Sequence, residues 1–233
     1  MRKPIVILGG MGPQASLRLH QLLMQESLRY HNGSGDGFPY VVHFSLPVAD
    51  FISDAAAQKA AAQTLRGLSG TIRALEPTSI LLACNTAHLL AEEVALLRRA
   101  PFVSMPETVA DTLEQRGLQR VGLLATPNTI RSGLYHRVFA RRGIATVAPS
   151  APQRRQLEAA IRSVIAGELA PAHQKKLLAI ATSLERRGAE AIVLGCTELP
   201  LLFPASESPL PAFDCLQLLA EAAISQQYCI MEK

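Results

Sequence analysis

Short apolar runs that stop at glycine or polar residues alternate with longer stretches of helical periodicity along almost the whole chain. The first run, Ile5–Leu8, ends in glycines and is followed by a stretch with leucines at helical spacing. A run that is apolar at every position is typical of a strand buried on both faces. Strands that alternate with helices predict parallel sheets covered by helices, so the predicted fold class is α/β.

The pattern begins a second time near the middle of the chain. Residues 120–126, RVGLLAT, resemble residues 4–10, PIVILGG, and the spacing of these two runs is nearly that of Cys84 and Cys196. We therefore expect two similar Rossmann-like domains with parallel sheets and an active-site cleft between them. The compositional seams place the first domain at residues 1–104 plus 212–233 and the second at residues 105–211.

The same patterns predict the individual elements. Strands are expected at residues 5–8, 40–45, 79–83, 102–105, 120–126, 145–148, 191–194 and 210–214. Helices are expected at residues 15–30, 55–75, 86–99, 107–116, 127–142, 153–167, 172–187 and 215–227.

Composition narrows the class of protein. The chain has 233 residues, of which 48% are hydrophobic, so it can bury a substantial core. Its formal charge of +4 is spread over scattered arginine pairs, which argues against a nucleic-acid partner. No apolar stretch approaches the roughly 20 residues of a membrane helix, and the first apolar run is too short for a secretory signal. We expect a soluble, cytoplasmic protein with no membrane partner.

Three polar segments follow expected strands and mark a candidate site: Gly9–Ser16, Ala83–His88 and Gly195–Pro200. Ligands of open α/β sheets bind at the carboxyl ends of the strands. The first segment fits the dinucleotide pattern G-x-G-x-x-A, but Pro13 lacks an N–H group and no acidic residue follows the second strand. A nucleotide-dependent enzyme stays an alternative. The preferred interpretation of the Gly9–Ser16 segment is a turn that holds a smaller anion such as a carboxylate.

Cys84 and Cys196 are candidates for acid–base chemistry. Each is expected at the start of a helix or turn, where the helix dipole lowers the pKa of a thiol. A pair of opposed thiols can remove a proton from one face of a carbon and return one on the other, and pre-placed donors such as Asn85 and Thr197 can stabilise the carbanion. The other thiols, Cys215 and Cys229, are expected to be inert.

Two neighbours of these thiols have open roles. His88 is either a base that assists Cys84 or a residue that packs near the helix start. Glu198 orients an ammonium group, tunes Cys196 or caps the first turn. The four cysteines lack metal-binding spacing, so no metal is expected.

These three segments resemble those of the aspartate/glutamate racemase family, the cofactor-independent amino-acid racemases. The resemblance rests on residues 9–13, on Cys84-Asn85-Thr86 with His88, and on residues 195–198. It implies Cys84 and Cys196 as the catalytic acid and base, no PLP, no metal and a homodimer. It also implies a substrate pocket lined by Met11, Asn85, Thr86 and Thr197. We expect Gly12, Gln14 and Glu198 to bind the substrate as well.

The chain departs from the family pattern at two positions. Phe51 stands where aspartate racemases carry an arginine that holds a substrate carboxylate, and loss of such a clamp is not a conservative change. Gln14, Arg18 and His43 are the residues that could replace it. A lysine expected near residues 160–167 has no clear counterpart, because Arg162 or Ala166 falls there.

The sequence therefore predicts an isomerase that inverts the α-carbon of an amino acid which need not be acidic. One alternative is a related thiol-dependent isomerase or decarboxylase. Another is a small-molecule-binding protein of the same fold without catalytic activity.

Overall fold

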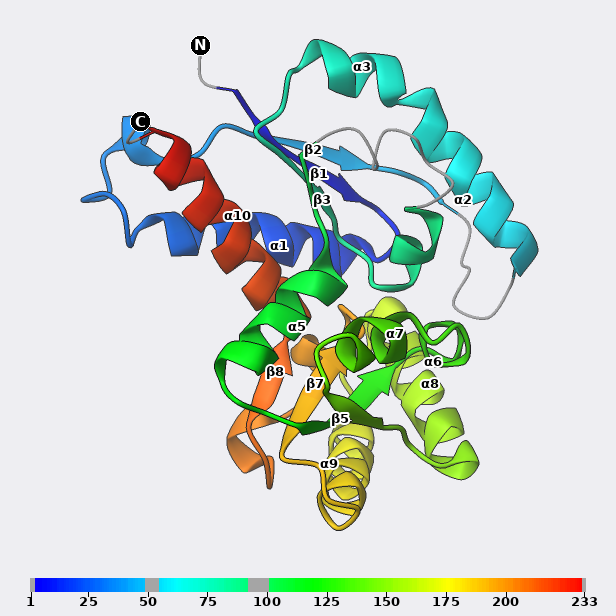
Figure 1. Ribbon diagram of the computed structural model, residues 1–233. Coiled ribbons are helices and arrows are strands. Elements are labelled where there is room, and N and C mark those ends of the chain that lie inside the picture. The colour runs from blue at the N-terminus through cyan, green and yellow to red at the C-terminus, as the bar shows by residue number, and fades with distance from the viewer. Residues whose placement is uncertain (1–2, 49–54, 92–100, 232–233) are drawn as a thin grey trace. The chain divides into compact units, whose positions relative to one another are not determined.

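The computed structural model describes residues 3–48, 55–91 and 101–231 (Figure 1). The protein is α/β, and the described residues form two four-stranded parallel sheets, as predicted. The chain divides into two compact units, residues 1–105 with 216–233, and residues 106–215. No helix among the described residues has the length and apolar character needed to cross a membrane.

The first unit contains a sheet with the strand order β2-β1-β3-β4. Its strands are β1 (Ile5–Gly9), β2 (Val41–Ser45), β3 (Ser79–Leu82) and β4 (Phe102–Val103). Its helices include α1 (Pro13–Ser27), η1 (Gly35–Gly37), α2 (Ala55–Gly67), α3 (Ser69–Ala74), η2 (Thr86–Leu90) and α10 (Cys215–Met231).

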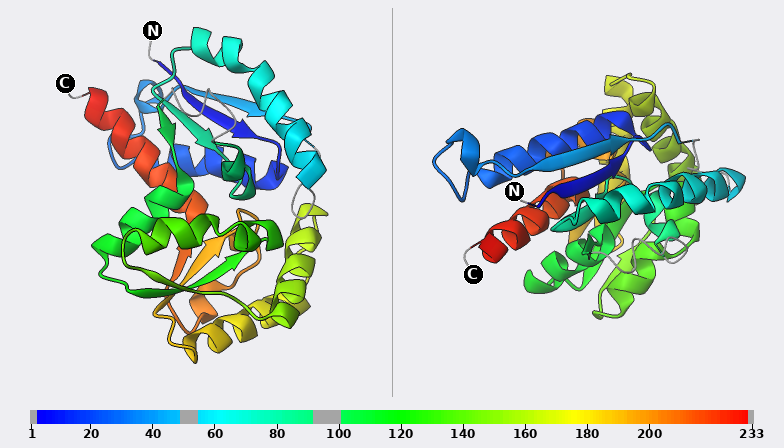
Figure 2. Two further views of the ribbon diagram at one scale, coloured as in Figure 1. Left: turned by 45° about the vertical axis from the view of Figure 1, so that its right-hand side comes forward. Right: turned by 90° about the horizontal axis from the view of Figure 1, so that it is seen from above.

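Helices cover both faces of this sheet. Val6 and Leu8 of β1 point into a buried cluster with residues of α2 and α3, and this cluster also contains Cys84. The other face of β1 meets α1, because a side chain at Gly9 would collide with Ser16. The view from above in Figure 2 shows the strands between α1 on one side and α2 with α3 on the other.

The C-terminal helix α10 returns to the first unit and lies beside α1 (Figures 1 and 2). The amide of Gln217 donates to Glu26 at 2.6 Å. Near its far end, Tyr228 stacks on Tyr30 with ring centroids 4.7 Å apart. These contacts join α10 to α1 and to the segment that follows α1.

The second unit repeats the arrangement with the strand order β6-β5-β7-β8. Its strands are β5 (Arg120–Ala125), β6 (Ala145–Val147), β7 (Ala191–Gly195) and β8 (Ala212–Asp214). Its helices include α5 (Met105–Gln115), α6 (Pro127–Arg131), α7 (Leu134–Ala140), α8 (Ala151–Ile165), α9 (Pro171–Glu185), η3 (Leu199–Leu201) and η4 (Ala205–Glu207). Residues 212–214, which the sequence analysis assigned to the first domain, pair with β7 and so belong to this sheet.

Three expected helices differ from the prediction. The helix expected at residues 55–75 is divided into α2 and α3 next to Gly67 and Gly70, residues that are unfavourable inside helices. The helix expected at residues 127–142 is divided at Gly133, which adopts a φ of 66°. Residues 86–90 form the 3₁₀ helix η2 and not the first turn of an α-helix, and residues 92–99 lie outside the described part.

Candidate active site

Cys84 and Cys196 follow equivalent strands of the two sheets. Strands β3 and β7 each occupy the third position in their strand order. Each lies next to the first strand of its sheet in the sequence, β1 or β5. Cys84 is 9% exposed and Cys196 is 3% exposed. The prediction that both thiols stand at the carboxyl end of a buried parallel strand is confirmed.

The turn after β3 buries a group of small polar side chains around Cys84. The N–H of Ala83 donates to the carbonyl of Leu8 at 3.0 Å, which extends the pairing of β3 with β1 up to the thiol. Asn85 and Thr86 follow and are both buried. Met11, from the glycine turn after β1, packs against the same buried cluster as Cys84. Three of the predicted pocket residues are thus brought close to this strand end.

His88 does not act on the thiol of Cys84 in this arrangement. Its Nδ1 lies 2.9 Å from the carbonyl oxygen of Cys84, and its Nε2 accepts the N–H of Met105 at 3.1 Å. Burial lowers the pKa of His88 to about 4, so the ring is neutral near pH 7. Of the two roles left open by the sequence, the contacts favour the packing role over that of a base.

The turn after β7 holds Cys196 against a carboxylate. The Cys196 thiol donates to Oε2 of Glu198 at 3.1 Å, and the Thr197 hydroxyl donates to the same oxygen at 2.9 Å. All three side chains are buried. A buried carboxylate that accepts these two hydrogen bonds fixes the direction of the thiol and favours its protonated form. Of the roles considered for Glu198, contact with Cys196 is the one observed.

A second buried contact lies in the same unit. The hydroxyl of Tyr135, on α7, is 3.2 Å from the sulfur of Cys215, and both residues are fully buried. Burial raises the pKa of Tyr135 well above 10, and Cys215 and Cys196 raise it further. Tyr135 is therefore protonated at any working pH. Cys215 is a core residue, as expected.

The described elements that directly follow the two thiols are short 3₁₀ helices, and residues 92–100 after η2 lie outside the described part. The 3₁₀ helix η2 spans five residues and η3 spans three. A macrodipole grows from the alignment of many peptide units, so the three residues of η3 contribute little of it at Cys196. At Cys196 the electrostatic environment is set instead by Glu198.

The glycine turn after β1 is closed upon itself. The N–H of Gly10 lies 3.3 Å from the Ser16 hydroxyl, which in turn donates to the carbonyl of Pro13. Gly10 adopts a φ of 88°, and a Cβ there would lie 2.2 Å from the Leu46 carbonyl oxygen. The Gly10 amide is therefore occupied within the turn, and an anion would have to be held by other groups.

The candidates for a carboxylate clamp differ in their environments. Gln14 is exposed in the first turn of α1, and Arg18 is partly buried on the same helix. Burial lowers the pKa of His43, as does nearby His20, so this ring carries no charge near pH 7 and is a poor clamp. Phe51, at the position of the expected arginine, lies outside the described residues.

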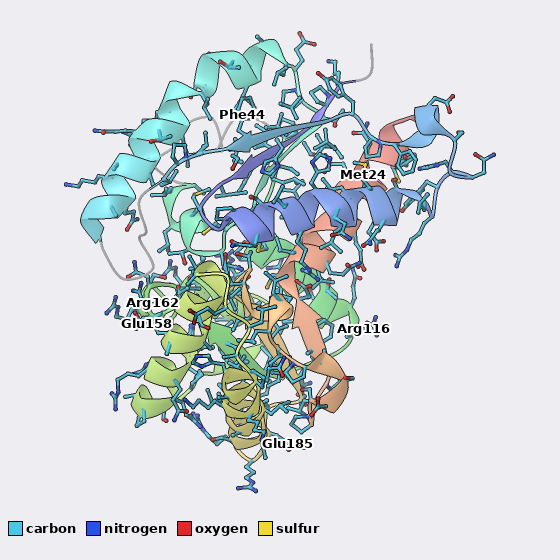
Figure 3. All side chains as sticks on the ribbon, turned by 180° about the vertical axis from the view of Figure 1, so that it is seen from behind. Met24, Phe44, Arg116, Glu158, Arg162 and Glu185 are labelled. Atoms are coloured by element: carbon cyan, nitrogen blue, oxygen red, sulfur yellow. The ribbon has the colours of Figure 1, made fainter. Side chains whose placement is uncertain are left out.

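The region of the expected lysine in the second half is also described. Figure 3 shows Arg162 beside Glu158 on α8, and the two side chains are 2.9 Å apart. Ala166 is the residue at the C-terminal cap of the same helix. In the described part of the chain, no group of three or more His, Cys, Asp or Glu side chains is arranged to hold a metal ion.

All three polar segments lie within the part of the chain that matches a known protein family. The family model described as Asp/Glu/Hydantoin racemase matches residues 8–223, which include all three polar segments. The chain belongs to this racemase family.

The names of individual relatives indicate different substrate ranges for those proteins. The chain is 26% identical over 233 residues to a protein named broad specificity amino-acid racemase RacX from Bacillus subtilis (strain 168), covering 95% of this chain and 96% of that protein. It is 27% identical over 224 residues to a glutamate racemase from Pseudomonas entomophila (strain L48), covering 94% and 76%.

A solved structure resembles this racemase family member over nearly its whole length. The crystal structure of an aspartate racemase homologue from Pyrococcus horikoshii OT3 superimposes with a TM-score of 0.80 at 24% identity, covering 97% of this chain and 99% of that chain. At this identity the likeness supports the fold. The expected resemblance and the expected two-domain α/β fold are both confirmed.

Two long-range contacts in this racemase family member were not found from the sequence. Tyr135 reaches Cys215 across 80 positions of the chain, and Met105 reaches His88 across 17. Neither contact has a local signal, because periodicity predicts only that Tyr135 and Met105 are buried. Glu198, the fourth residue of the GCTE segment, was found from its place two residues after Cys196.

Proposed function

We propose that the protein is a cofactor-independent amino-acid racemase of the aspartate/glutamate type, with Cys84 and Cys196 as its two acid–base residues. One thiolate takes the α-proton, and the electron pair of the broken C–H bond stays on the substrate as a carbanion. The other thiol then gives its proton to the opposite face of the α-carbon and becomes a thiolate. The roles reverse for the other enantiomer, so proton and charge balance in both directions.

The observation that carries this proposal is the placement of the two thiols at equivalent strand ends. The two sheets have the same strand order, and the strand in the same position of each ends in a buried cysteine followed by small polar residues. Each of these strand ends also buries small polar residues beside its cysteine, which an apolar core has no need of. Two-base racemisation needs one thiol for each face of the α-carbon, which is what a duplicated scaffold supplies.

The contacts of Cys196 indicate which protonation state it takes at rest. Its thiol donates to Glu198, so the sulfur carries a proton in this arrangement. A carboxylate next to a thiol opposes formation of a second negative charge. We therefore assign Cys196 as the acid of the resting enzyme and Cys84 as the thiolate that takes the first proton. The two sites titrate as a coupled pair, because each turnover exchanges their roles.

The remaining predicted residues would bind the substrate. Asn85 and Thr86 are small polar residues beside Cys84 and supply donors for a carboxylate whose charge grows in the transition state, whereas Thr197, whose hydroxyl donates to Glu198, forms part of the pocket beside Cys196. Met11, Gly12 and Gln14 belong to the glycine turn and the start of α1. No step of this mechanism calls on PLP or a metal, because the thiols move the proton and the donors stabilise the carbanion.

The proposed substrate is an amino acid whose side chain is not restricted to a carboxylate. The arginine of aspartate racemases is replaced by Phe51, and His43 is neutral near pH 7. Among the relatives, one is named as a broad specificity racemase and another as a glutamate racemase. The homodimer and the cytoplasmic location stay predictions.

The test is a racemisation assay over a panel of amino acids that includes apolar, polar and acidic side chains. The wild type should convert at least one amino acid, and both Cys84→Ser and Cys196→Ser should lower kcat by roughly a thousandfold. Cys229→Ser is the matched control, because it removes an exposed thiol outside the site and should keep full activity. Full activity of Cys84→Ser or Cys196→Ser would refute the two-thiol proposal. A wild type that converts no amino acid, yet is stabilised by one, would favour the binding-protein alternative.

A further inference from the structure

His88 ties the backbone of Cys84 to a distant segment of the first unit. The Met105 N–H can only donate, so Nε2 of His88 must carry the lone pair. The proton of the neutral ring then lies on Nδ1 and is donated to the carbonyl of Cys84 at 2.9 Å. Both ring nitrogens are therefore used by backbone groups, and one tautomer satisfies both.

The environment of the ring keeps this bridge in place. His88 is 5% exposed, and its ring packs at 5.5 Å from the ring of Phe102 on β4. Met105 follows β4, begins α5 and is the last residue of the first unit before the chain enters the second. Low pKa of the ring, about 4, keeps the acceptor on Nε2 available throughout the neutral range. The bridge therefore joins the Cys84 turn to the point where the chain leaves the unit.

The bridge acts on the peptide group of Cys84 itself. On its N-terminal side, the turn is anchored to β1 by the Ala83 N–H bond to Leu8. On its C-terminal side, the carbonyl of Cys84 is held by His88. Together these bonds fix the backbone orientation at Cys84, and with it the direction of the Cα–Cβ bond that carries the sulfur. An imidazole that served packing alone would not need both of its nitrogens directed at these groups.

We infer that His88 is a positioning residue that aims the thiol of Cys84 by holding its carbonyl, without touching the substrate. This inference rests on the proposed function for its catalytic consequence, since it assumes that Cys84 takes a proton from the α-carbon. Its structural consequence, a fixed direction and reactivity of the Cys84 sulfur, can be measured separately. A misplacement on the order of 1 Å at a reacting group can lower a rate by about a hundredfold.

Two substitutions separate the two hydrogen bonds of the ring. In His88→Asn, the side-chain amide can still donate to the carbonyl of Cys84 but is too short to accept from Met105. In His88→Gln, the longer side chain can still accept from Met105 but has no donor at the Nδ1 position. Both variants lose one hydrogen bond, so a merely structural role predicts similar losses for the two. A positioning role predicts that His88→Asn rescues function and His88→Gln does not.

The first readout is alkylation of Cys84 by iodoacetamide in the full-length protein, followed by mass spectrometry of the labelled peptides, with Cys229 as the internal reference. We expect His88→Gln to change the labelling rate of Cys84 relative to Cys229 by at least fivefold, and His88→Asn to leave it within about twofold. Leu19→Ala, which truncates a fully buried residue of α1, is the control for lost stability alone and should not change the ratio. Equal ratios in the wild type, His88→Gln and His88→Asn would overturn the inference.

The second readout is the kinetics of the racemase. His88→Gln should lower kcat by roughly ten- to a hundredfold with little change in KM. Its deuterium isotope effect should rise in the direction in which Cys84 removes the α-proton, and not in the other direction. Equal effects of the two variants in both directions would contradict a role in aiming Cys84. If the wild type racemises nothing, the proposed function fails, and the labelling ratio still decides whether His88 positions the thiol.

Discussion

The buried imidazole of His88 should make the protein lose stability as the pH falls below about 6.5. Burial lowers the pKa of this ring from 6.5 to about 4. In the unfolded chain the ring binds a proton near pH 6.5, whereas in the folded protein it does so only near pH 4. The unfolded state therefore binds more protons between these two values, and acid shifts the equilibrium towards unfolding.

The size of this effect follows from the two pKa values. A difference of one pKa unit corresponds to about 1.4 kcal/mol, so the complete loss between pH 6.5 and pH 4 is about 3 kcal/mol for the change in His88. Between pH 7 and pH 5, the same linkage gives a loss of about 2 kcal/mol. This is a sizeable part of the roughly 5–15 kcal/mol by which native proteins are stable.

The assay is urea unfolding of the wild type and His88→Asn at a series of pH values, followed by circular dichroism. Asparagine does not titrate, so the variant should be less stable at pH 7 but should lose less stability on acidification. The two curves of unfolding free energy against pH should therefore converge below pH 6.5. His43 and His136, whose pKa values are also lowered by burial, are present in both proteins and cancel in the comparison. Curves that stay parallel from pH 7 to pH 5 would refute the reasoning.

Two further predictions concern the turns of the site. Gly10→Ala should destabilise the protein more than Gly33→Ala in urea unfolding, because both glycines have a φ near 88° but only a Cβ at Gly10 would meet backbone, at 2.2 Å from Leu46. The conformational cost shared by both variants is about 1–2 kcal/mol, and equal losses would show that the close approach is not real. Glu198→Gln should lower kcat by roughly a hundredfold while the unfolding free energy changes by less than about 1 kcal/mol, because the amide no longer holds the Cys196 proton as a carboxylate does. If Glu198→Gln leaves both kcat and its pH profile unchanged, Glu198 does not control the protonation of Cys196.

The positions of the strands could be predicted well because most of them are short, continuous apolar runs. Ile5–Gly9 and Ala191–Gly195 are buried at every position, and a short uninterrupted apolar run that ends at glycine is typical of a central parallel strand. The equivalence of the two halves also followed from the sequence, since the runs that start each half are similar and the cysteines keep their spacing.

Helix boundaries were harder to predict for a physical reason. The break between α2 and α3 and the break at Gly133 depend on single residues whose cost in a helix, about 1 kcal/mol, is small enough for tertiary contacts to decide the outcome. The same holds for η2 after Cys84, where bonds from His88 to the backbone replace a regular helical turn. Such contacts cannot be derived from periodicity.

The candidate site was predictable in its residues but not in its connections. Cysteines followed by small polar residues at strand ends marked Cys84 and Cys196. The state of each side chain, however, depends on surroundings brought by folding: burial keeps His88 neutral, the Met105 N–H fixes its tautomer, and the geometry of the second turn brings Glu198 to Cys196. Residue types and their spacing indicate which side chains can exchange protons. The protonation state of each side chain depends on its contacts in the folded protein.

The central claim is that two thiols, one on each side of the α-carbon, exchange its proton. The most direct measurement is NMR of a substrate amino acid incubated with the enzyme in deuterium oxide, stopped early in the reaction. The two-thiol account predicts α-deuterium in the product enantiomer and almost none in the remaining substrate, and Cys84→Ser or Cys196→Ser should form the product enantiomer at no more than roughly a thousandth of the wild-type rate. Deuterium that appears equally in both enantiomers from the start, or product enantiomer formed by either variant at the wild-type rate, would contradict it.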